Sequence, residues 1–214
     1  MKRVALLFEN DDCLVLNKPA GLSVQGGKSV GVSLDSLLSG EWSPRPLLVH
    51  RLDKDTSGVI LVAKTAWAAV RFSALFAGEG GRFARKQYLA VCAGQPEQEE
   101  GRIREELEIR GKGKYAETSY RVVSGKEGFS LLELELGTGR MHQIRRHLAL
   151  IGHPVLGDDK YGDFRLNKEL RRTRGIRRLL LHASRLVISA EALGYPLDVQ
   201  APLPEYFSPF ANPG

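Results

Sequence analysis

The chain has 214 residues, of which 43% are hydrophobic and 26% are charged. This length and composition are typical of a globular protein with a buried core and exclude a fibrous or intrinsically disordered chain. The charge is uneven: residues 140–178 contain eleven Lys or Arg and four Asp or Glu, a net +7, whereas the rest contains 20 and 21, a net −1. A concentrated positive field favours a polyanionic partner, most commonly nucleic acid. A membrane surface fits less well, because no long basic amphipathic helix carries Trp or Phe opposite its charges.

Cysteine usage and the N-terminal segment indicate the compartment. Only Cys13 and Cys92 occur, each within an apolar stretch, so neither a disulfide framework nor a zinc knuckle is expected. The chain enters an apolar strand at Val4 without a cleavable leader or a membrane span. We therefore expect a cytoplasmic protein. Because no internal repeat or linker is visible, the simplest expectation is one domain over residues 1–214.

The first half of the chain alternates short apolar stretches with polar loops. The expected elements, in chain order, are strands at 4–8 and 13–17, a loop at 17–22, a short helix near 33–38, a polar loop at 50–58, a strand at 59–63, a helix from Thr65 to Ala77 and a strand at 86–93.

The second half continues with an acidic hairpin or edge strand at 97–108, strands at 116–123 and 129–136, a helix at about 140–151, a basic helix or loop at 165–178, and a strand at 179–188. Strands and helices are interspersed without strict alternation. This order predicts an α+β fold with a mixed, mostly antiparallel central sheet flanked by helices.

The expected helix at 140–151 carries an arginine at the edge of its apolar stripe. Met141, Ile144, Leu148 and Ile151 form that stripe, and Arg145 lies about 80° from its centre at 100° per residue. A guanidinium in such a place needs an anion, which could be a structural carboxylate, a phosphate or a catalytic group.

The loop from His50 to Gly58 places Asp53 between basic side chains, just before an apolar strand. Its Asp-x-Asp-x-Ser-Gly stretch resembles the start of a calcium-binding loop, but Lys64 stands where that motif requires a bidentate Glu. We therefore expect no calcium. The remaining alternatives are a solvated loop with a capping carboxylate and a catalytic carboxylate.

Three further groups have ordinary structural explanations. His142, His147 and His153 lack the one-face spacing of a zinc helix, so no metal is expected. Tyr88, taken alone, is typical of an aromatic side chain in the core of a sheet. The aspartates at 158, 159 and 163 are expected to form a turn.

Four blocks, in this order and spacing, resemble the RluA-like family of RNA pseudouridine synthases over nearly the whole chain. They are Leu16-Asn-Lys-Pro-Ala-Gly-Leu22, His50-Arg-Leu-Asp-Lys-Asp-Thr-Ser-Gly58, Lys86-Gln-Tyr-Leu-Ala90, and Thr138-Gly-Arg-Met-His-Gln-Ile-Arg145 continuing into Gly152-His-Pro154. Residues 157–163 and 180–183 also look like the family's C-terminal pattern.

The resemblance implies isomerisation of uridine to pseudouridine within RNA, without a metal or organic cofactor, on the pseudouridine synthase fold. It implies that Asp53 is the catalytic carboxylate, that Tyr88 stacks on the target base and assists proton removal, and that Arg145 pairs with Asp53. It also implies that Arg51 supports the flipped-out nucleotide.

The chemistry agrees with these roles. An ionised carboxylate can capture the sugar or the base while the uracil turns, whether by attack on C1′, addition at C6 or promotion of a glycal intermediate. In a dry site an opposite charge such as Arg145 would keep Asp53 ionised. The target nucleotide must leave its stack, and an aromatic face such as that of Tyr88 favours the extruded base.

We expect further substrate contacts on both sides of this site, with phosphates held by the basic segment at 165–178. The candidate substrate-binding residues are Arg51, His50, Arg140, His142, Gln143, Arg171, Arg172 and Arg174. The C-terminal pattern favours large-subunit ribosomal RNA as the substrate, with transfer RNA as the alternative. No N-terminal S4-type domain and no protein partner are expected, and the protein is expected to be a monomer.

Two other functions remain open at this level. A non-catalytic RNA-binding or RNA-folding protein could use the same scaffold. A carboxylate-based glycosidase or nucleosidase would need a second acid about 5 to 10 Å from Asp53.

Overall fold

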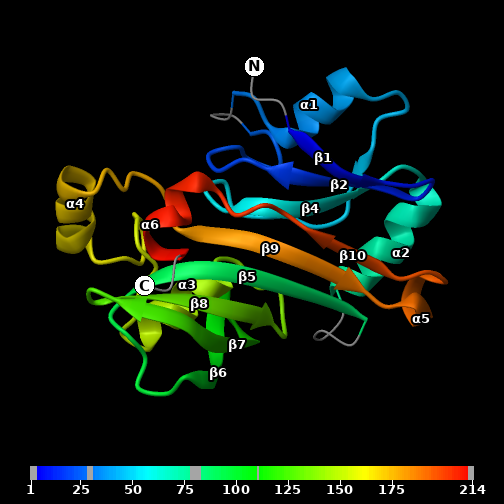
Figure 1. Ribbon diagram of the computed structural model, residues 1–214. Coiled ribbons are helices and arrows are strands. Elements are labelled where there is room, and N and C mark those ends of the chain that lie inside the picture. The colour runs from blue at the N-terminus through cyan, green and yellow to red at the C-terminus, as the bar shows by residue number, and fades with distance from the viewer. Residues whose placement is uncertain (1–3, 28–30, 78–82, 110, 212–214) are drawn as a thin grey trace. The chain divides into compact units, whose positions relative to one another are not determined.

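The computed structural model of the chain describes residues 4–27, 31–77, 83–109 and 111–211 (Figure 1). These residues form two compact units. The first contains residues 4–77, 83–85 and 183–202, and the second contains residues 86–182 and 203–211. The chain passes from one unit to the other within two strands, β5 (Ala84–Ala93) and β9 (Leu181–Ile188).

The first unit contains the strand order β1-β2-β4-β9, with β3 beside β4 and β10 beside β9. The pairs β1–β2, β2–β4, β3–β4 and β9–β10 are antiparallel. The strands are β1 (Ala5–Glu9), β2 (Cys13–Lys18), β3 (Leu47–Leu48), β4 (Ser57–Ala63), β9 and β10 (Leu197–Gln200), and the helices are α1 (Leu34–Glu41), α2 (Ala66–Ala77) and α5 (Ala190–Leu193).

Local sequence signals set the starts of two helices in this unit. Ser33 and Ser36 form a reciprocal capping box at the start of α1. The hydroxyl of Thr65 accepts the Ala68 N–H at 3.1 Å at the start of α2, where the sequence predicted a cap. Every residue of β4 is buried, in agreement with its continuous apolar sequence.

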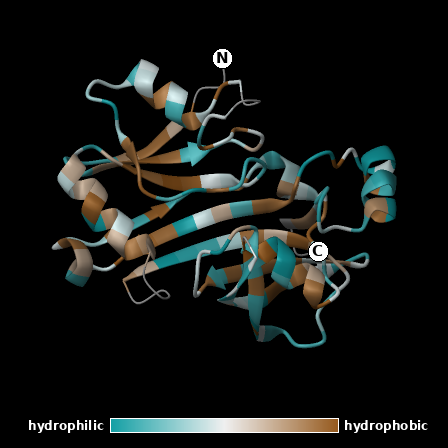
Figure 2. Cartoon of the chain, turned by 180° about the vertical axis from the view of Figure 1, so that it is seen from behind, coloured by the Kyte–Doolittle hydropathy of each residue, from teal (hydrophilic) through white to brown (hydrophobic). Residues whose placement is uncertain are grey.

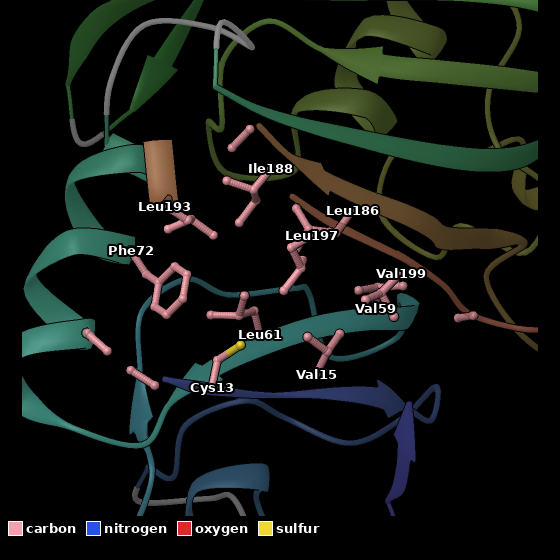
Figure 3. Packing of buried hydrophobic residues seen from close by; sticks show 14 residues of the cluster. Cys13, Val15, Val59, Leu61, Phe72, Leu186, Ile188, Leu193, Leu197 and Val199 are labelled. Atoms are coloured by element: carbon pink, nitrogen blue, oxygen red, sulfur yellow. The ribbon is translucent and has the colours of Figure 1, made fainter. Parts of the chain in front are cut away.

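An apolar cluster holds the first unit together (Figure 3). Val15 of β2, Leu61 of β4, Phe72 of α2 and Leu186 of β9 are each at most 2% exposed and belong to it. Burial of one such side chain stabilises the folded state by about 2 kcal/mol. The cluster fixes the strands that lead into and out of the His50–Gly58 loop.

The second unit contains the strand order β5-β8-β7-β6, with β5–β8, β7–β8 and β6–β7 antiparallel. Its further strands are β6 (Glu100–Ile109), β7 (Lys112–Lys126) and β8 (Phe129–Leu136), and its helices are α3 (Gln143–Leu150), α4 (Phe164–Thr173), the 3-10 helix η1 (Glu205–Phe207) and α6 (Ser208–Ala211). A second apolar cluster contains Val91, Leu131, Leu156, Leu170, Leu180 and Phe207.

The predicted fold class is confirmed: strands and helices are interspersed, and the strand pairs described above are antiparallel. The acidic stretch forms β6, which stands last in the strand order of the second unit. The assignment of residues 1–214 to one domain stays a prediction. None of the helices in the described ranges has both the length and the apolar character needed to cross a bilayer.

The helix expected at 140–151 is shorter than predicted, and the assignment of Met141 to its apolar stripe was wrong. Arg140 to His142 form a turn, and His142 adopts a left-handed backbone conformation with φ 53° before α3 begins at Gln143. Met141 therefore lies outside the helix and is 50% exposed. The tertiary contacts of Gln143, described below, explain why the helix starts late.

Candidate active site

Asp53 lies in a loop that is fastened at both ends. It is half-buried and stands between the buried Leu52 and the exposed Lys54. On one side, His50 Nε2 accepts the Leu61 N–H at 2.9 Å, and its ring lies 4.3 Å from that of Phe76. These contacts of His50 hold the backbone of the loop that carries the Asp53 carboxylate.

On the other side, a buried lysine fastens the loop. Lys18, at the end of β2, is 0% exposed, and its ammonium donates to three carbonyl oxygens: Leu22 at 2.8 Å, Lys54 at 3.0 Å and Pro19 at 3.1 Å. The Lys54 carbonyl also accepts the Gly21 N–H at 2.9 Å. An ammonium has three donors, so these contacts match its full capacity. Sequence reasoning missed this role, although Lys18 stands in the first of the family-like blocks.

Gly58, opposite Lys18 in the β2–β4 register, allows β9 to approach the end of the loop. Its φ is +110°, and an added Cβ would lie 2.1 Å from the Ala183 carbonyl oxygen. No other residue fits this position, because both the backbone conformation and the space exclude a side chain.

In the second unit, Arg145 forms a buried two-point ion pair with Asp158. Nε and Nη2 donate to the two carboxylate oxygens, each at 2.7 Å, and the side chains are 7% and 0% exposed. Burial alone would raise the pKa of Asp158. The Arg145 guanidinium and the backbone N–H groups of Tyr161 and Lys160 outweigh that effect and hold this pKa below its usual range. Asp158 is thus a permanently charged partner at neutral pH.

The loop that carries Asp158 is closely packed. Gly157 has φ +72°, and an added Cβ would lie 1.9 Å from the Arg178 carbonyl oxygen. Asn167 donates to the Asp158 carbonyl and accepts the Gly157 N–H, both at 2.8 Å. A turn was predicted for the aspartates at 158, 159 and 163. Asp158 Oδ1 accepts the Lys160 and Tyr161 N–H groups at 2.9 and 3.0 Å, as in a turn, and Asp163 caps α4. The ion pair between Asp158 and Arg145 was not predicted.

Tyr161 borders the same arginine. Its ring centre lies 5.2 Å from the Arg145 guanidinium carbon, and its hydroxyl lies 3.0 Å from His142 Nδ1. Lys160 Nζ is 5.3 Å from the ring centre. The left-handed backbone of His142 aims its imidazole at Tyr161, so His142 is held by a protein contact. Tyr161 was also missed; the only signal for it is its place in the block at 157–163.

Tyr88 lies on β5 and is 7% exposed. Lys86 lies two residues earlier and therefore shares its face of the strand. Burial lowers the pKa of the Lys86 ammonium. The partly desolvated Lys86 ammonium and the Tyr88 ring thus share one face of β5, which is suited to contact an anionic substrate.

Gln143 is a buried side chain that makes four hydrogen bonds within the protein. It is 3% exposed; its amide oxygen accepts from the Thr138 hydroxyl at 2.6 Å and the Arg140 N–H at 2.9 Å, and its amide nitrogen donates to the Glu117 carbonyl at 2.8 Å and the Thr118 hydroxyl at 3.0 Å. These bonds use all of its hydrogen-bonding groups. They also fix the turn before α3.

The histidines considered as metal ligands have separate surroundings. His147 is 0% exposed, and its Nδ1 lies 2.9 Å from the Thr118 hydroxyl. Burial, reinforced by the charge of Arg146, lowers the pKa of His147 to about 4, so the ring is neutral at pH 7. His153 Nδ1 lies 3.0 Å from the Ala93 carbonyl oxygen.

The remaining candidates are more exposed. Arg51 is exposed, and Arg140 donates from Nε to the Tyr115 carbonyl at 3.1 Å. Arg171 and Arg172 lie exposed on α4, whereas Arg174 forms an ion pair with Glu127 at 2.6 Å. His50, Arg51 and Asp53 belong to the first unit and the other candidates to the second, so the pairing of Asp53 with Arg145 stays a prediction.

Comparison with known proteins identifies the family. Residues 12–150 match the model of the family described as RNA pseudouridylate synthase. The chain belongs to this family. The matched segment contains Asp53, Tyr88 and Arg145, whereas Asp158 and Tyr161 lie beyond its end.

Named relatives and a solved structure agree with the family assignment. The ribosomal large subunit pseudouridine synthase C of Rickettsia bellii is 34% identical over 218 residues, covering 95% of this chain and 69% of that protein. The synthase D of Xanthomonas campestris is 38% identical over 221 residues, covering 94% and 66%. The structure of human RNA Pseudouridylate Synthase Domain Containing 4 matches with a TM-score of 0.79 at 27% identity, covering 95% of this chain and 90% of that chain.

Replacing Lys18 by Met tests the fastening of the Asp53 loop. The variant removes the Lys18 donor from the Pro19 and Leu22 carbonyl oxygens and one of two donors from the Lys54 carbonyl oxygen, so we expect a loss of about 2 kcal/mol or more in the free energy of unfolding. Urea denaturation measures this loss. Lys64→Met removes a half-buried lysine that is paired with Glu9 near the surface, and it should cost less than about 1 kcal/mol. Equal stability of Lys18→Met and wild type would contradict the assigned role.

Replacing Asp158 by Asn tests the buried ion pair. We expect a loss of about 3 kcal/mol at pH 7, because the buried Arg145 loses its two-point partner and retains the more distant Asp159, whose Oδ1 lies 3.7 Å from Nη2. The folded-state pKa of Asp158 lies below the unfolded value of about 3.9, so its contribution is present above that pH and fades as the pH falls through the folded-state pKa. The difference between variant and wild type should therefore be smaller at pH 3 than at pH 7 in urea denaturation.

Asp198→Asn is the matched control for this variant, because Asp198 forms a two-point pair with Arg185 at the surface. It should cost less than about 1 kcal/mol at either pH. A pH-independent loss in Asp158→Asn would show that the carboxylate charge is not the source of the stabilisation.

Proposed function

We propose that this protein isomerises uridines of large-subunit ribosomal RNA to pseudouridine, with Asp53 as the catalytic carboxylate. The observation that carries the proposal is the family match over residues 12–150, which contains Asp53 on a fastened loop. The ribosomal target rests on the relatives named ribosomal large subunit pseudouridine synthases. The protein is proposed to act in the cytoplasm as a monomer.

In this reaction the bond from C1′ to N1 breaks and a bond from C1′ to C5 forms. The proton on C5 leaves to a base, and N1 gains a proton, so atoms and charge balance without a co-reactant. Asp53 is proposed to capture the sugar or the base during the exchange. The loop contacts of Lys18 and His50 support this role, because a carboxylate that acts on a rotating ring must keep its own position.

Arg145 is proposed to keep Asp53 ionised and to orient it. Asp158 binds Nε and Nη2, and Asp159 Oδ1 lies 3.7 Å from Nη2. A guanidinium carries five N–H donors, so it can bind more than one carboxylate at the same time. Tyr88 is proposed to stack on the extruded uracil and to take part in removing the C5 proton. Arg51, Arg140 and His142 are proposed to contact the surrounding nucleotides.

A glycosidase or nucleosidase is the less suitable function. Such an enzyme needs a second carboxyl group that holds a proton at neutral pH and therefore has a raised pKa. Asp158, the most deeply buried carboxylate among the described residues, has a lowered pKa and is committed to Arg145. It cannot serve as that acid.

Tritium release from RNA labelled at uridine C5 tests the catalytic proposal. Wild type should release the label, and Asp53→Asn should reduce release by more than about 10³-fold while leaving RNA binding intact. Asp55→Asn removes an exposed carboxylate from the same loop and should stay close to wild type. Label release by Asp53→Asn at the wild-type rate would reject Asp53 as the catalytic group. Binding without release by either protein would favour the non-catalytic function.

The same assay with separate RNA pools tests the substrate class. Large-subunit ribosomal RNA and transfer RNA, each prepared without prior modification, are incubated with wild type. We expect release from the ribosomal pool only. Release from transfer RNA alone would overturn the ribosomal assignment while preserving the isomerase.

A further inference from the structure

The inner face of helix α4 packs against the core of the second unit. Leu170 is 3% exposed and belongs to the apolar cluster of the second unit, and Leu166 packs against that cluster. Asp163 caps the helix by accepting the Arg165 and Leu166 N–H groups at 2.9 and 3.0 Å. The packing and the cap hold α4 in place, so the same side chains always form its outer, solvent-facing side.

The outer face gathers one aromatic ring and four cations. At 100° per residue, these side chains fall within an arc of about 120°, on a stretch about 12 Å long. They are Phe164, Arg165, Lys168, Arg171 and Arg172, and all five are exposed. Glu169, the nearest acid, points about 40° outside this arc. Most of α4 is hydrophilic in Figure 2. We call these five residues the α4 face.

Within the part of the chain that the structure describes, the cations of the α4 face have no carboxylate partners. Throughout the described ranges, Arg165, Lys168, Arg171 and Arg172 make no ion pair and no side-chain hydrogen bond. Arg174 differs, because it is paired with Glu127 and lies 5.3 Å from the Phe129 ring centre. The net charge of the basic stretch is thus concentrated on side chains that are available to an anion.

Phe164 is the one apolar side chain of the α4 face, so its exposure needs an explanation other than electrostatic attraction. It is 64% exposed, although the helix places its leucines inward. An exposed phenyl ring beside four cations combines the two features that bind unpaired nucleotides: a surface on which a base stacks, and donors for the phosphates that flank it.

We propose that the α4 face binds a single-stranded segment of the substrate RNA, with one base stacked on Phe164 and the neighbouring phosphates held by Lys168, Arg171 and Arg172. This inference rests on the proposed function for its RNA partner and adds a docking surface to it. Duplex RNA fits less well, because its bases are already stacked and cannot cover the ring. A membrane also fits less well, because the leucines that would insert are buried in the protein core.

Fluorescence anisotropy with RNA that cannot react tests the docking surface. The probes are a single-stranded oligoadenylate of about 12 nucleotides and an RNA duplex of the same length that contains only G·C pairs. Phe164→Ala should weaken single-strand binding by about fivefold to a hundredfold and change duplex binding less than about twofold. Leu150→Ala, which truncates a side chain that is 60% exposed on α3, is the matched control and should bind like wild type.

The salt dependence tests the phosphate contacts. Arg171→Gln should flatten the slope of log affinity against log salt concentration by about 0.7 for the single strand. Arg121→Gln removes the same charge from β7, where Arg121 is paired with Glu133 at 2.6 Å, so its slope should stay close to that of wild type. Equal changes in the two variants would show a general field effect and overturn the proposed contacts.

Unchanged single-strand affinity in Phe164→Ala, or an equal loss for the duplex, would also overturn the proposal. Loss of binding to anionic phospholipid vesicles, with RNA binding unchanged, would assign the face to a membrane instead. The probes lack uridine, so the result does not depend on catalysis. If wild type releases no tritium while Phe164→Ala still weakens single-strand binding, the proposed isomerase activity is rejected and the proposed docking surface is retained.

Discussion

The Arg145–Asp158 ion pair is the constraint around which the second unit is arranged. A guanidinium at 7% exposure has lost most of its water, and such a charge persists only with a counter-charge of matching geometry. Asp158 supplies it through two bonds, and the surrounding loop holds Asp158 through Asn167 and through backbone N–H groups. The glycines at 157 and 162 follow from the same requirement, since a side chain at either would collide with the neighbouring backbone.

The first unit meets a similar requirement with a different cation. Lys18 is fully buried and is satisfied by carbonyl oxygens instead of a carboxylate. Three carbonyl oxygens accept from the Lys18 ammonium, whereas a carboxylate holds the Arg145 guanidinium. Lys18 therefore both fastens the loop and adds a positive charge close to the Asp53 backbone.

The cations of this protein fall into two groups with different physical roles. Lys18 and Arg145 are buried and hold loops of the protein in place, and Arg174 forms an exposed ion pair with Glu127. The cations of this group are satisfied by contacts within the chain. The exposed cations of the α4 face make no ion pair with the described residues, so their field extends into solvent. The count of charges along the sequence cannot separate these groups, because the distinction depends on where the acidic partners lie after folding.

The sequence by itself determined the order and type of most elements, the Asp53 loop and the family. Apolar periodicity and caps such as Ser33 and Thr65 are local signals, and they need no knowledge of distant contacts. Only the tertiary structure showed that Gln143 is buried, that Met141 is exposed, and that Arg145 binds Asp158. These facts depend on residues far apart along the chain: the Thr118 hydroxyl and Glu117 carbonyl bind the Gln143 side chain and set the start of α3. A helical projection cannot contain such contacts, because they arise only when β7 packs beside the turn.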